Sequence, residues 1–239
     1  MAYNDEDIIV RNQTTGVWSL FFDGSDVGLT TSAADVDAFY LMSDGSLLLS
    51  FVGDPSITGL GTVARSDIVR FVGTLGSNTS GTFTMYFDGS DVGLTTTAEN
   101  IDAMGVDGNG RLLISTTGNP SVTGLTGLAD EDVIAFTPSS LGATTSGSWS
   151  YYFDGSDVGL ADSNSEDVTG SWADANGDLY LSALGTFSVS GASGDGADIF
   201  RCASFVSGST TSCTFSLYWD GSVNGFAGEV MDGLFIDKP

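Results

Sequence analysis

The stretch Phe22-Asp23-Gly24-Ser25-Asp26-Val27-Gly28-Leu29 occurs three times in this sequence without change. The further copies occupy residues 87–94 and 153–160, and a degraded copy, Trp219-Asp220-Gly221-Ser222-Val223-Asn224-Gly225-Phe226, follows them. Successive copies begin 65, 66 and 66 residues apart. A fixed period of this length indicates one structural unit repeated along the chain. The sequence therefore predicts a single repeat domain over residues 1–239, with units at approximately 1–29, 30–94, 95–160 and 161–226 and a partial unit at 227–239.

Each full unit has the pattern of four short strands. Asp44-Gly45 and Asn176-Gly177 are strong hairpin signals, and they separate the first strand of a unit from the second. A third strand is expected at residues 67–72, and a fourth at residues 82–87 leads into the repeated stretch. The Gly-, Ser- and Thr-rich residues 73–81 form the turn between them. No helical period of 3.6 residues persists anywhere in the chain.

The fourth strand is apolar on both faces. Trp18, Leu20 and Phe22 alternate with Ser19 and Phe21, so that each face carries an aromatic side chain. The corresponding second-face residues in the later copies are Tyr86, Tyr152 and Tyr218. Sheets covered on both faces are typical of blades packed against neighbouring blades, whereas a two-sheet sandwich shows a cleaner alternation. The fold class predicted is all-β, a β-propeller of about four four-stranded blades.

The two ends of the chain divide one unit between them. The chain opens with a third and a fourth strand, at residues 7–11 and 17–22, and it closes with a first strand at residues 230–236. The last blade is therefore predicted to be incomplete, or closed by the N- and C-terminal strands together. An open solenoid, or a fragment of a longer array, is the alternative.

The charge balance excludes several classes of partner. The chain has 31 acidic and 6 basic residues and no histidine, which gives a net charge of −25. Such a surface repels nucleic acids and anionic lipid headgroups. No apolar run is long enough to span a membrane, so membrane insertion is not expected. A saline environment, calcium binding and simple colloidal solubility each account for the acidity.

The sequence predicts no enzyme and no catalytic residue. Without histidine, a Ser-His-Asp or Cys-His site is impossible. The acidic residues are distributed symmetrically over near-identical repeats, whereas an active site normally makes one unit different from the others. A glycosidase with paired carboxylates is the alternative that the sequence leaves open.

The carboxylates of the repeated stretch are candidate ligands for Ca²⁺. Two aspartates three residues apart flank a Gly-Ser bend, and Asp35, Asp37 or Asp102 would add oxygens from the strand that follows. Calcium takes six to eight oxygen ligands, which carboxylates, a hydroxyl and turn carbonyls supply. The alternative is that each aspartate only caps its own turn. The candidate metal ligands are Asp23, Asp26, Asp88, Asp91, Asp154, Asp157 and Asp220.

Three further groups of residues are candidates for a functional role. The acidic runs at residues 5–7, 130–132 and 166–167 are expected to be solvated strand entries that protect sheet edges from mispairing. Cys202 and Cys213 flank a turn-like stretch, which predicts a cross-strand disulfide and with it an oxidising compartment; two packed thiols are the alternative. The aromatic residues are either a sugar-binding platform or, as their strand periodicity favours, packing between blades. They are Tyr40, Trp172, Tyr180 and the series Phe21, Tyr86, Tyr152 and Tyr218.

The three identical copies, with Asp-Gly turns between them, resemble β repeats of this length in large secreted bacterial proteins of unassigned function. The last copy departs from the pattern at Val223 and Asn224. The resemblance implies an extracellular or cell-surface location and an interaction role, without naming a ligand. The predicted function is a non-enzymatic binding or adhesion module, stabilised by calcium, for a protein or carbohydrate surface. The alternative is a self-associating building block of an extracellular lattice, filament or virion surface.

Overall fold

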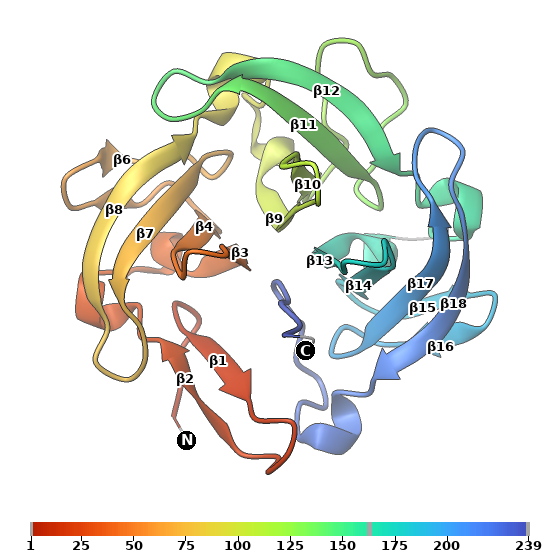
Figure 1. The fold of residues 1–239 in the computed structure, drawn as a ribbon, viewed down its shortest axis with the longest axis horizontal. Helices are drawn as coiled ribbons and strands as arrows, with labels where there is room; N and C mark the ends of the chain where they lie inside the picture. Colours follow the sequence, from red (N-terminus) through yellow and green to blue (C-terminus); the bar gives the residue numbers. More distant parts are fainter. Residues whose placement is uncertain (1, 162–163, 238–239) are drawn as a thin grey trace.

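The computed structural model describes residues 2–161 and 164–237. Within these residues it contains 18 β-strands and no α-helix. Twelve of the strands form three four-stranded antiparallel sheets, which stand around a common centre (Figure 1). The all-β class predicted from the repeat is confirmed.

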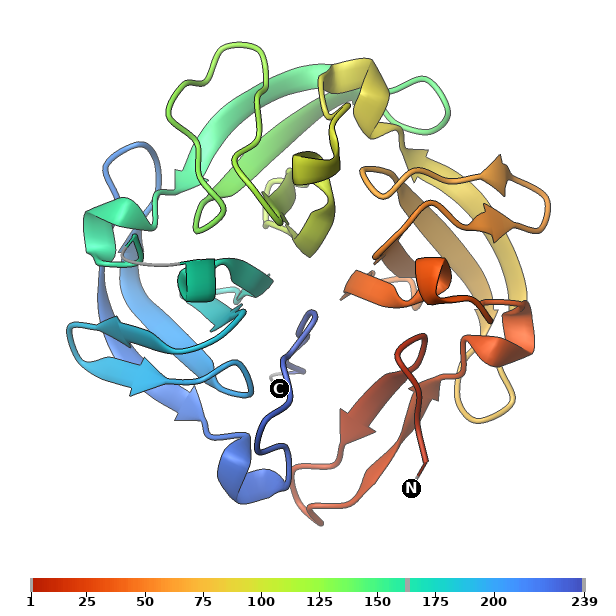
Figure 2. The same ribbon diagram turned by 180° about the vertical axis from the view of Figure 1, so that it is seen from behind.

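The three sheets are built alike, each from one stretch of the chain. In each sheet the first strand of the unit lies innermost and the fourth lies at the periphery, as Figures 1 and 2 show. The first sheet contains β3 (Val36–Leu41), β4 (Leu47–Phe51), β7 (Ile68–Thr74) and β8 (Ser80–Phe87). The second contains β9 (Ile101–Val106), β10 (Leu112–Thr116), β11 (Val133–Ser140) and β12 (Ser146–Phe153). The third contains β13 (Val168–Ala173), β14 (Leu179–Ala183), β17 (Ile199–Val206) and β18 (Ser212–Trp219).

The sequence signals for turns occur where the backbone reverses. Gly45, Gly110 and Gly177 close the three inner hairpins with φ of 83°, 78° and 85°, a conformation that residues with a Cβ rarely adopt. Every copy of the repeated stretch forms a short 3-10 helix after the outer strand. These helices are η1 (Ser25–Val27), η3 (Gly89–Val92), η5 (Ser156–Val158) and η7 (Ser222–Asn224).

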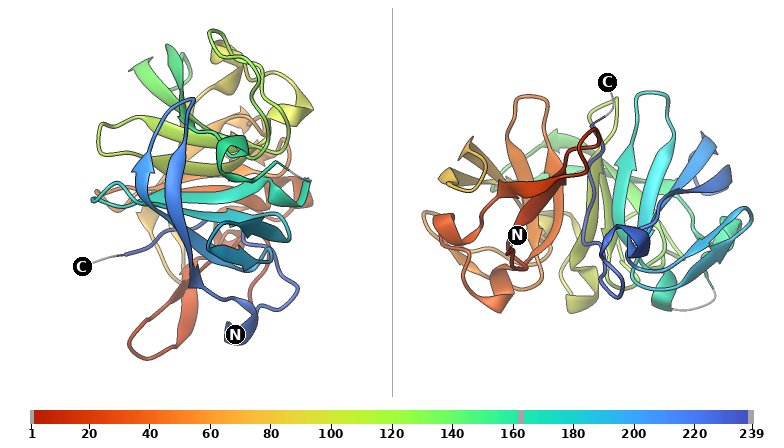
Figure 3. Two further views of the ribbon diagram at one scale, coloured as in Figure 1. Left: turned by 90° about the vertical axis from the view of Figure 1, so that its right-hand side faces the viewer. Right: turned by 90° about the horizontal axis from the view of Figure 1, so that it is seen from below.

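Two small hairpins lie between the second and third strands of a unit, and the repeat pattern did not predict them. They are β5 (Ser56–Ile57) with β6 (Gly61–Thr62), and β15 (Phe187–Val189) with β16 (Ala192–Gly194). In the side views the β13–β14 turn projects from one end of the molecule, whereas the 3-10 helices of the repeated stretches gather at the other (Figure 3). Among the described residues there is no helix whose length and apolar character would let it cross a membrane.

The core lies between adjacent sheets rather than on one side of each. Phe87, at the end of β8 in the first sheet, is fully buried and packs 5.3 Å from Phe136 of the second sheet, centroid to centroid. One apolar cluster joins the first and second sheets, and another joins the second and third. The second strands β4, β10 and β14 are buried on both faces, as expected for a sheet packed between two others. The outer strand β18 departs from the two-sided apolar pattern expected from the sequence, because its Leu217 and Tyr218 are exposed.

The N- and C-terminal parts of the chain meet at one side of the molecule. β1 (Ile8–Arg11) pairs with β2 (Trp18–Phe22), and the Trp18 ring packs 4.9 Å from the ring of Phe226. The C-terminal segment, residues 230–237, lies near the centre between β3 and β13 (Figure 1). There the Phe235 ring contacts the rings of Tyr40 and Trp172, at 5.8 and 6.0 Å.

The strand expected at residues 230–236 is not a strand in the structure. No hydrogen-bonded ladder includes these residues, although the Met231 N–H donates to the Gly196 carbonyl at 3.0 Å. In the complete units the first strand pairs with a second strand, and the described part of the chain supplies no second strand here. β1 correspondingly has a partner on one side only. The two ends of the chain are in contact, but no strand ladder joins them, so the expectation that an N-terminal and a C-terminal strand pair with each other was wrong.

Candidate functional site

The second aspartate of each repeated stretch binds the next unit along the chain. The Asp91 carboxylate accepts the backbone N–H of Thr145 at 2.8 Å, and the Thr145 hydroxyl oxygen accepts the backbone N–H of Asp88 at 2.9 Å. Thr145 lies in the turn between the third and fourth strands of the following sheet. The same reciprocal pair joins Asp23 and Asp26 to Thr79, and Asp154 and Asp157 to Thr211. We call this arrangement the inter-unit clasp.

The first aspartate of each stretch holds its own turn. The Asp88 carboxylate accepts the Ser90 hydroxyl at 2.7 Å and the Ser90 N–H at 3.1 Å. Corresponding hydroxyl bonds link Asp23 to Ser25, Asp154 to Ser156 and Asp220 to Ser222. All seven predicted metal ligands are thus engaged in the turn or in the clasp. Among the described residues no three or more Asp, Glu or Cys side chains are placed together so as to hold a metal ion. Calcium at the repeated stretch stays a prediction.

A third aspartate, which sequence reasoning placed in a solvated strand entry, is buried. Asp132 is 4% exposed, and its two carboxylate oxygens accept the N–H groups of Gly155 and Ala129 at 3.0 and 2.9 Å. Two backbone donors compensate this carboxylate for the loss of water, which is why it tolerates burial. Burial nevertheless raises the pKa of Asp132 to about 6. Asp7, Asp67 and Asp198 make the same pair of bonds.

A group of buried polar side chains lies where the inner strands begin. Asp37 on β3, Asp102 on β9, and Asn100 and Asp167, which directly precede β9 and β13, form what we call the axial cluster. These side chains are between 2% and 8% exposed. Burial together with the carboxyls of Asp167 and Asp37 raises the pKa of Asp102 well above its ordinary value. Burial chiefly, with further acidic neighbours, raises the pKa of Asp37 and of Asp167 to about 7.

Sequence reasoning treated Asp37 and Asp102 only as helpers of the repeated stretch, and Asp167 as a solvated residue. The structure places all three near the centre and joins none of them to the repeated stretch by a hydrogen bond. A signal was present in the sequence, because aspartate recurs at residues 37, 102, 167 and 232, with a constant step of 65. Asp232 belongs to the C-terminal segment and is exposed.

A groove opens at the opposite ends of the inner strands, with a volume of about 480 Å³. Tyr40, at the end of β3, and Tyr152, from β12, contribute aromatic rings. The β9–β10 turn contributes Asp107, Asn109 and Arg111, and Phe205 of β17 completes the apolar part. The three inner turns differ at this point, because the residues that correspond to Arg111 in the β3–β4 and β13–β14 turns are Ser46 and Asp178.

Arg111 is held firmly in this groove. Its Nε donates to the Asp107 carboxylate at 2.8 Å, and its guanidinium carbon lies 5.5 Å from the centroid of the Tyr152 ring. Burial first, and Asp107 second, raise the pKa of Tyr152 to about 12, so its hydroxyl stays protonated and can donate a hydrogen bond. The groove therefore combines aromatic faces with donors and acceptors whose charges nearly balance.

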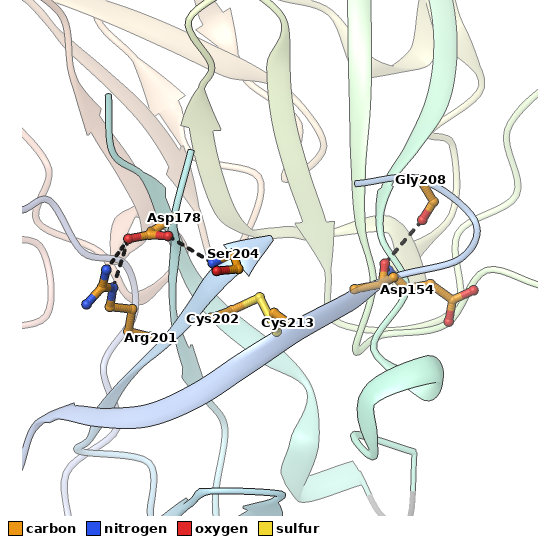
Figure 4. The surroundings of a disulfide bond; sticks show 8 residues. Asp154, Asp178, Arg201, Cys202, Ser204, Gly208 and Cys213 are labelled. Carbon is orange, nitrogen blue, oxygen red and sulfur yellow. Dashed lines mark hydrogen bonds and ion pairs between the residues drawn. A yellow bond between two sulfur atoms is a disulfide. The ribbon is translucent and has the colours of Figure 1, made fainter. Parts of the chain in front are cut away.

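The disulfide expected from the two cysteines is present. Cys202 of β17 and Cys213 of β18 are joined, with their Cα atoms 5.3 Å apart (Figure 4). Cys202 faces Phe215 in the ladder, so the bridge runs diagonally across the hairpin rather than between directly opposed residues. Nearby, Arg201 forms an ion pair with Asp178, which also accepts the Ser204 N–H at 3.2 Å.

Comparison with known proteins assigns no family. No protein-family model and no curated protein matches the chain. Among solved structures, virginiamycin B lyase from Staphylococcus aureus is 11% identical, with a TM-score of 0.33, over 90% of this chain and 47% of that one. The extracellular domain of a one-component system from B. thetaiotaomicron is 12% identical, with a TM-score of 0.28, over 95% of this chain and 33% of that one. This chain spans less than half the length of either structure, and at these TM-scores the matches carry no argument about activity.

Proposed function

We propose that the chain is a four-bladed β-propeller that acts as a non-enzymatic binding module. The three four-stranded sheets are three of the blades. The β1–β2 hairpin and the C-terminal segment together make a fourth blade that lacks its second strand. The packing of Phe235 against Tyr40 and Trp172, and of Trp18 against Phe226, supports this closure, because it joins the last segment to both neighbours and to the N-terminal hairpin.

The observation that carries the binding function is the groove around Arg111. The groove lies where inner strands from different sheets end. Arg111 gives this turn a positive charge, whereas the corresponding residues of the other two inner turns are Ser46 and Asp178. Aromatic rings beside an Arg–Asp pair and an amide suit a ligand with apolar faces and many hydroxyl groups. A net charge of −25 disfavours anionic ligands. The ligand class that fits is an uncharged carbohydrate, and a protein surface is the other outcome of the test.

Isothermal titration calorimetry with a panel of uncharged oligosaccharides tests this function. We expect one or more of them to bind the wild-type protein, and Arg111→Ala and Asn109→Ala to weaken that binding about tenfold. Arg65→Ala is the matched control, because Arg65 pairs with Asp54 outside the groove. Binding that is equal in Arg111→Ala and wild-type protein, or no binding to any member of the panel, would rule out the groove as a carbohydrate site.

The proposed location is the cell exterior or the cell surface. The Cys202–Cys213 disulfide supports it, because disulfides persist in oxidising compartments. Protein taken from its native source and denatured in a thiol-reactive reagent should remain unlabelled at both cysteines. Labelling of both would place the protein in a reducing compartment.

A second candidate function, a self-associating building block, is favoured by one observation. β1 pairs with β2 alone, so one edge of β1 can accept a strand from another molecule. On this hypothesis purified protein forms ordered polymers that are visible by electron microscopy. Val10→Lys, which places a charge on that edge, would abolish them, whereas Val17→Lys in the neighbouring turn would not. A monomer at all concentrations by size-exclusion chromatography with light scattering would exclude this candidate.

A further inference from the structure

The axial cluster differs from every other buried carboxylate described above. Asp132 receives two backbone N–H groups, and the buried Glu99 receives those of Thr95, Thr96 and Ser121. Asp102, by contrast, is 2% exposed, and neither of its carboxylate oxygens is reached by a donor in the described residues. A buried carboxylate without a donor is strongly destabilising, because nothing in the folded protein replaces the hydrogen bonds that it made with water in the unfolded chain.

The nearest groups make the imbalance larger. The Asp102 carboxyl faces that of Asp167, whose Oδ1 is also buried without a donor. Asn100 donates its amide nitrogen to Asp37, and this leaves the buried Asn100 Oδ1 without a partner as well. Reversing the Asn100 amide would only bring its oxygen against the Asp37 carboxylate. The cluster is thus a set of oxygen acceptors that lacks donors.

Among residues 2–161 and 164–237, no positive side chain balances this set. Arg65 is the one described cation that acts on Asp37, and it does so only at a distance, since its guanidinium is bound to Asp54. A proton shared between Asp102 and Asp167, a buried water or a bound cation would each satisfy some of the acceptors. A shared proton serves only the two carboxyls and leaves Asn100 Oδ1 without a partner. A cation can bind carboxylate and amide oxygens alike, and unlike a water or a shared proton it also offsets the negative charge of the carboxylates.

We propose that the axial cluster is a calcium-binding site, with Asp102, Asp167 and the Asn100 side-chain oxygen as its ligands. Calcium prefers carboxylate and amide oxygens, and it tolerates irregular geometry because its coordination shell is completed by carbonyls and water. Only two of these three ligands are acidic, which agrees with the lack of any metal-holding group of three acids in the described residues. Asp37 lies beside the site and positions the Asn100 amide. The ion would link the second and third sheets near the centre, independently of the Arg111 groove and of the repeated stretch.

Calorimetric titration of CaCl₂ into full-length protein freed of metal by a chelator tests the site. We expect about one calcium per chain, little heat with equal MgCl₂, and a Kd raised tenfold or more in Asp102→Asn and in Asp167→Asn. Asp91→Asn, which alters the inter-unit clasp, is the matched control and should bind calcium as the wild-type protein does. Binding of about three ions per chain that Asp91→Asn weakens and Asp102→Asn does not would overturn the proposal in favour of the repeated stretch.

Thermal unfolding separates a cation from a shared proton and also shows whether the variant folds. Without metal, Asp102→Asn should unfold at a higher temperature than the wild-type protein, because the new amide can donate a hydrogen bond to the Asp167 carboxyl. With saturating calcium the wild-type midpoint should rise, by an amount equivalent to about 2.7 kcal/mol at 100 times Kd, and that of Asp102→Asn should not. A wild-type midpoint that calcium leaves unchanged would show that a shared proton or a buried water satisfies the carboxyls, and would overturn the proposal.

Discussion

At the scale of single residues, one carboxylate can join two units of the repeat. Asp91 ends a turn in one unit and accepts the Thr145 N–H in the next, 54 residues away. The degraded copy has Val223 at the corresponding position, and this side chain is 76% exposed. The clasp therefore joins the N-terminal hairpin to the first sheet and each sheet to the next, and Val223 cannot form it where the chain ends meet. Aromatic packing by Phe226 and Trp18 takes its place there.

Replacing Asp91 by alanine should lower the free energy of unfolding by about 1 kcal/mol, because the Thr145 N–H loses its acceptor. Urea denaturation followed by tryptophan fluorescence measures this change. Val223→Ala is the control at the corresponding position without a clasp, and it should alter stability by less than about 0.5 kcal/mol. Equal effects of the two substitutions would show that the clasp adds nothing to stability.

At the scale of elements, the outer hairpin β17–β18 is the one that carries a covalent cross-link. Its loop between Cys202 and Cys213 closes eleven residues of chain. The neighbouring outer hairpins β7–β8 and β11–β12 have no cysteine and are held by clasps at their turns. Thr211 provides a clasp in β17–β18 too, so the disulfide there is an additional constraint.

Reduction of the disulfide should lower the free energy of unfolding by roughly 2–3 kcal/mol, the amount expected for a loop of this length. The comparison is between denaturant midpoints with and without a thiol reductant. The double variant Cys202→Ala, Cys213→Ala should be insensitive to the reductant, which controls for other effects of the reagent. An unchanged wild-type midpoint with fully reduced thiols would contradict the expectation.

At the scale of the whole molecule, aromatic side chains from the two ends of the chain pack together. Trp18 contacts both Trp219 and Phe226, and these residues lie some 200 positions along the chain from it. A double-mutant cycle with Trp18→Ala and Phe226→Ala should give a coupling energy of about 0.5–1.5 kcal/mol. Strictly additive effects on unfolding would show that the ends do not pack together in solution.

The axial cluster makes the stability of the metal-free molecule depend on pH. The pKa values of Asp37 and Asp167 are about 7 in the folded protein and near 4 in an unfolded chain. The folded state therefore binds more protons between these values. The stability that these groups contribute is fully present below pH 4, and it is lost as the pH rises to about 7. Asp232 and Arg65 are the charged groups that act on Asp37, which also accepts a hydrogen bond from the Asn100 amide. The acidic groups that act on Asp167 are Asp130, Asp102, Asp37 and Glu131.

We expect the free energy of unfolding of the chelator-treated protein to fall between pH 5 and pH 8, by up to about 1.4 kcal/mol per pH unit for each group, and its thermal midpoint to fall with it. Scanning calorimetry across this range measures the slope. Asp37→Asn should make the profile flatter, whereas Asp54→Asn should not, because pairing with Arg65 holds the pKa of Asp54 below its ordinary value. A midpoint that rises steadily from pH 5 to pH 8 would contradict this prediction.

The repeat, the hairpins, the all-β class and the disulfide were predictable from the sequence because their signals are local. An Asp-Gly turn, an alternating strand and two cysteines eleven residues apart each act within a short stretch of chain. The inter-unit clasp and the axial cluster were not predictable in this way. Asp91 and Thr145, or Asp102 and Asp167, become neighbours only when separate sheets stand around one centre. That arrangement also decides which buried carboxylate receives a backbone donor, as Asp132 does, and which receives none, as is the case for Asp102. In water every aspartate is hydrogen-bonded in the same way, and burial removes that water, so the tertiary structure alone determines the partners of each carboxylate.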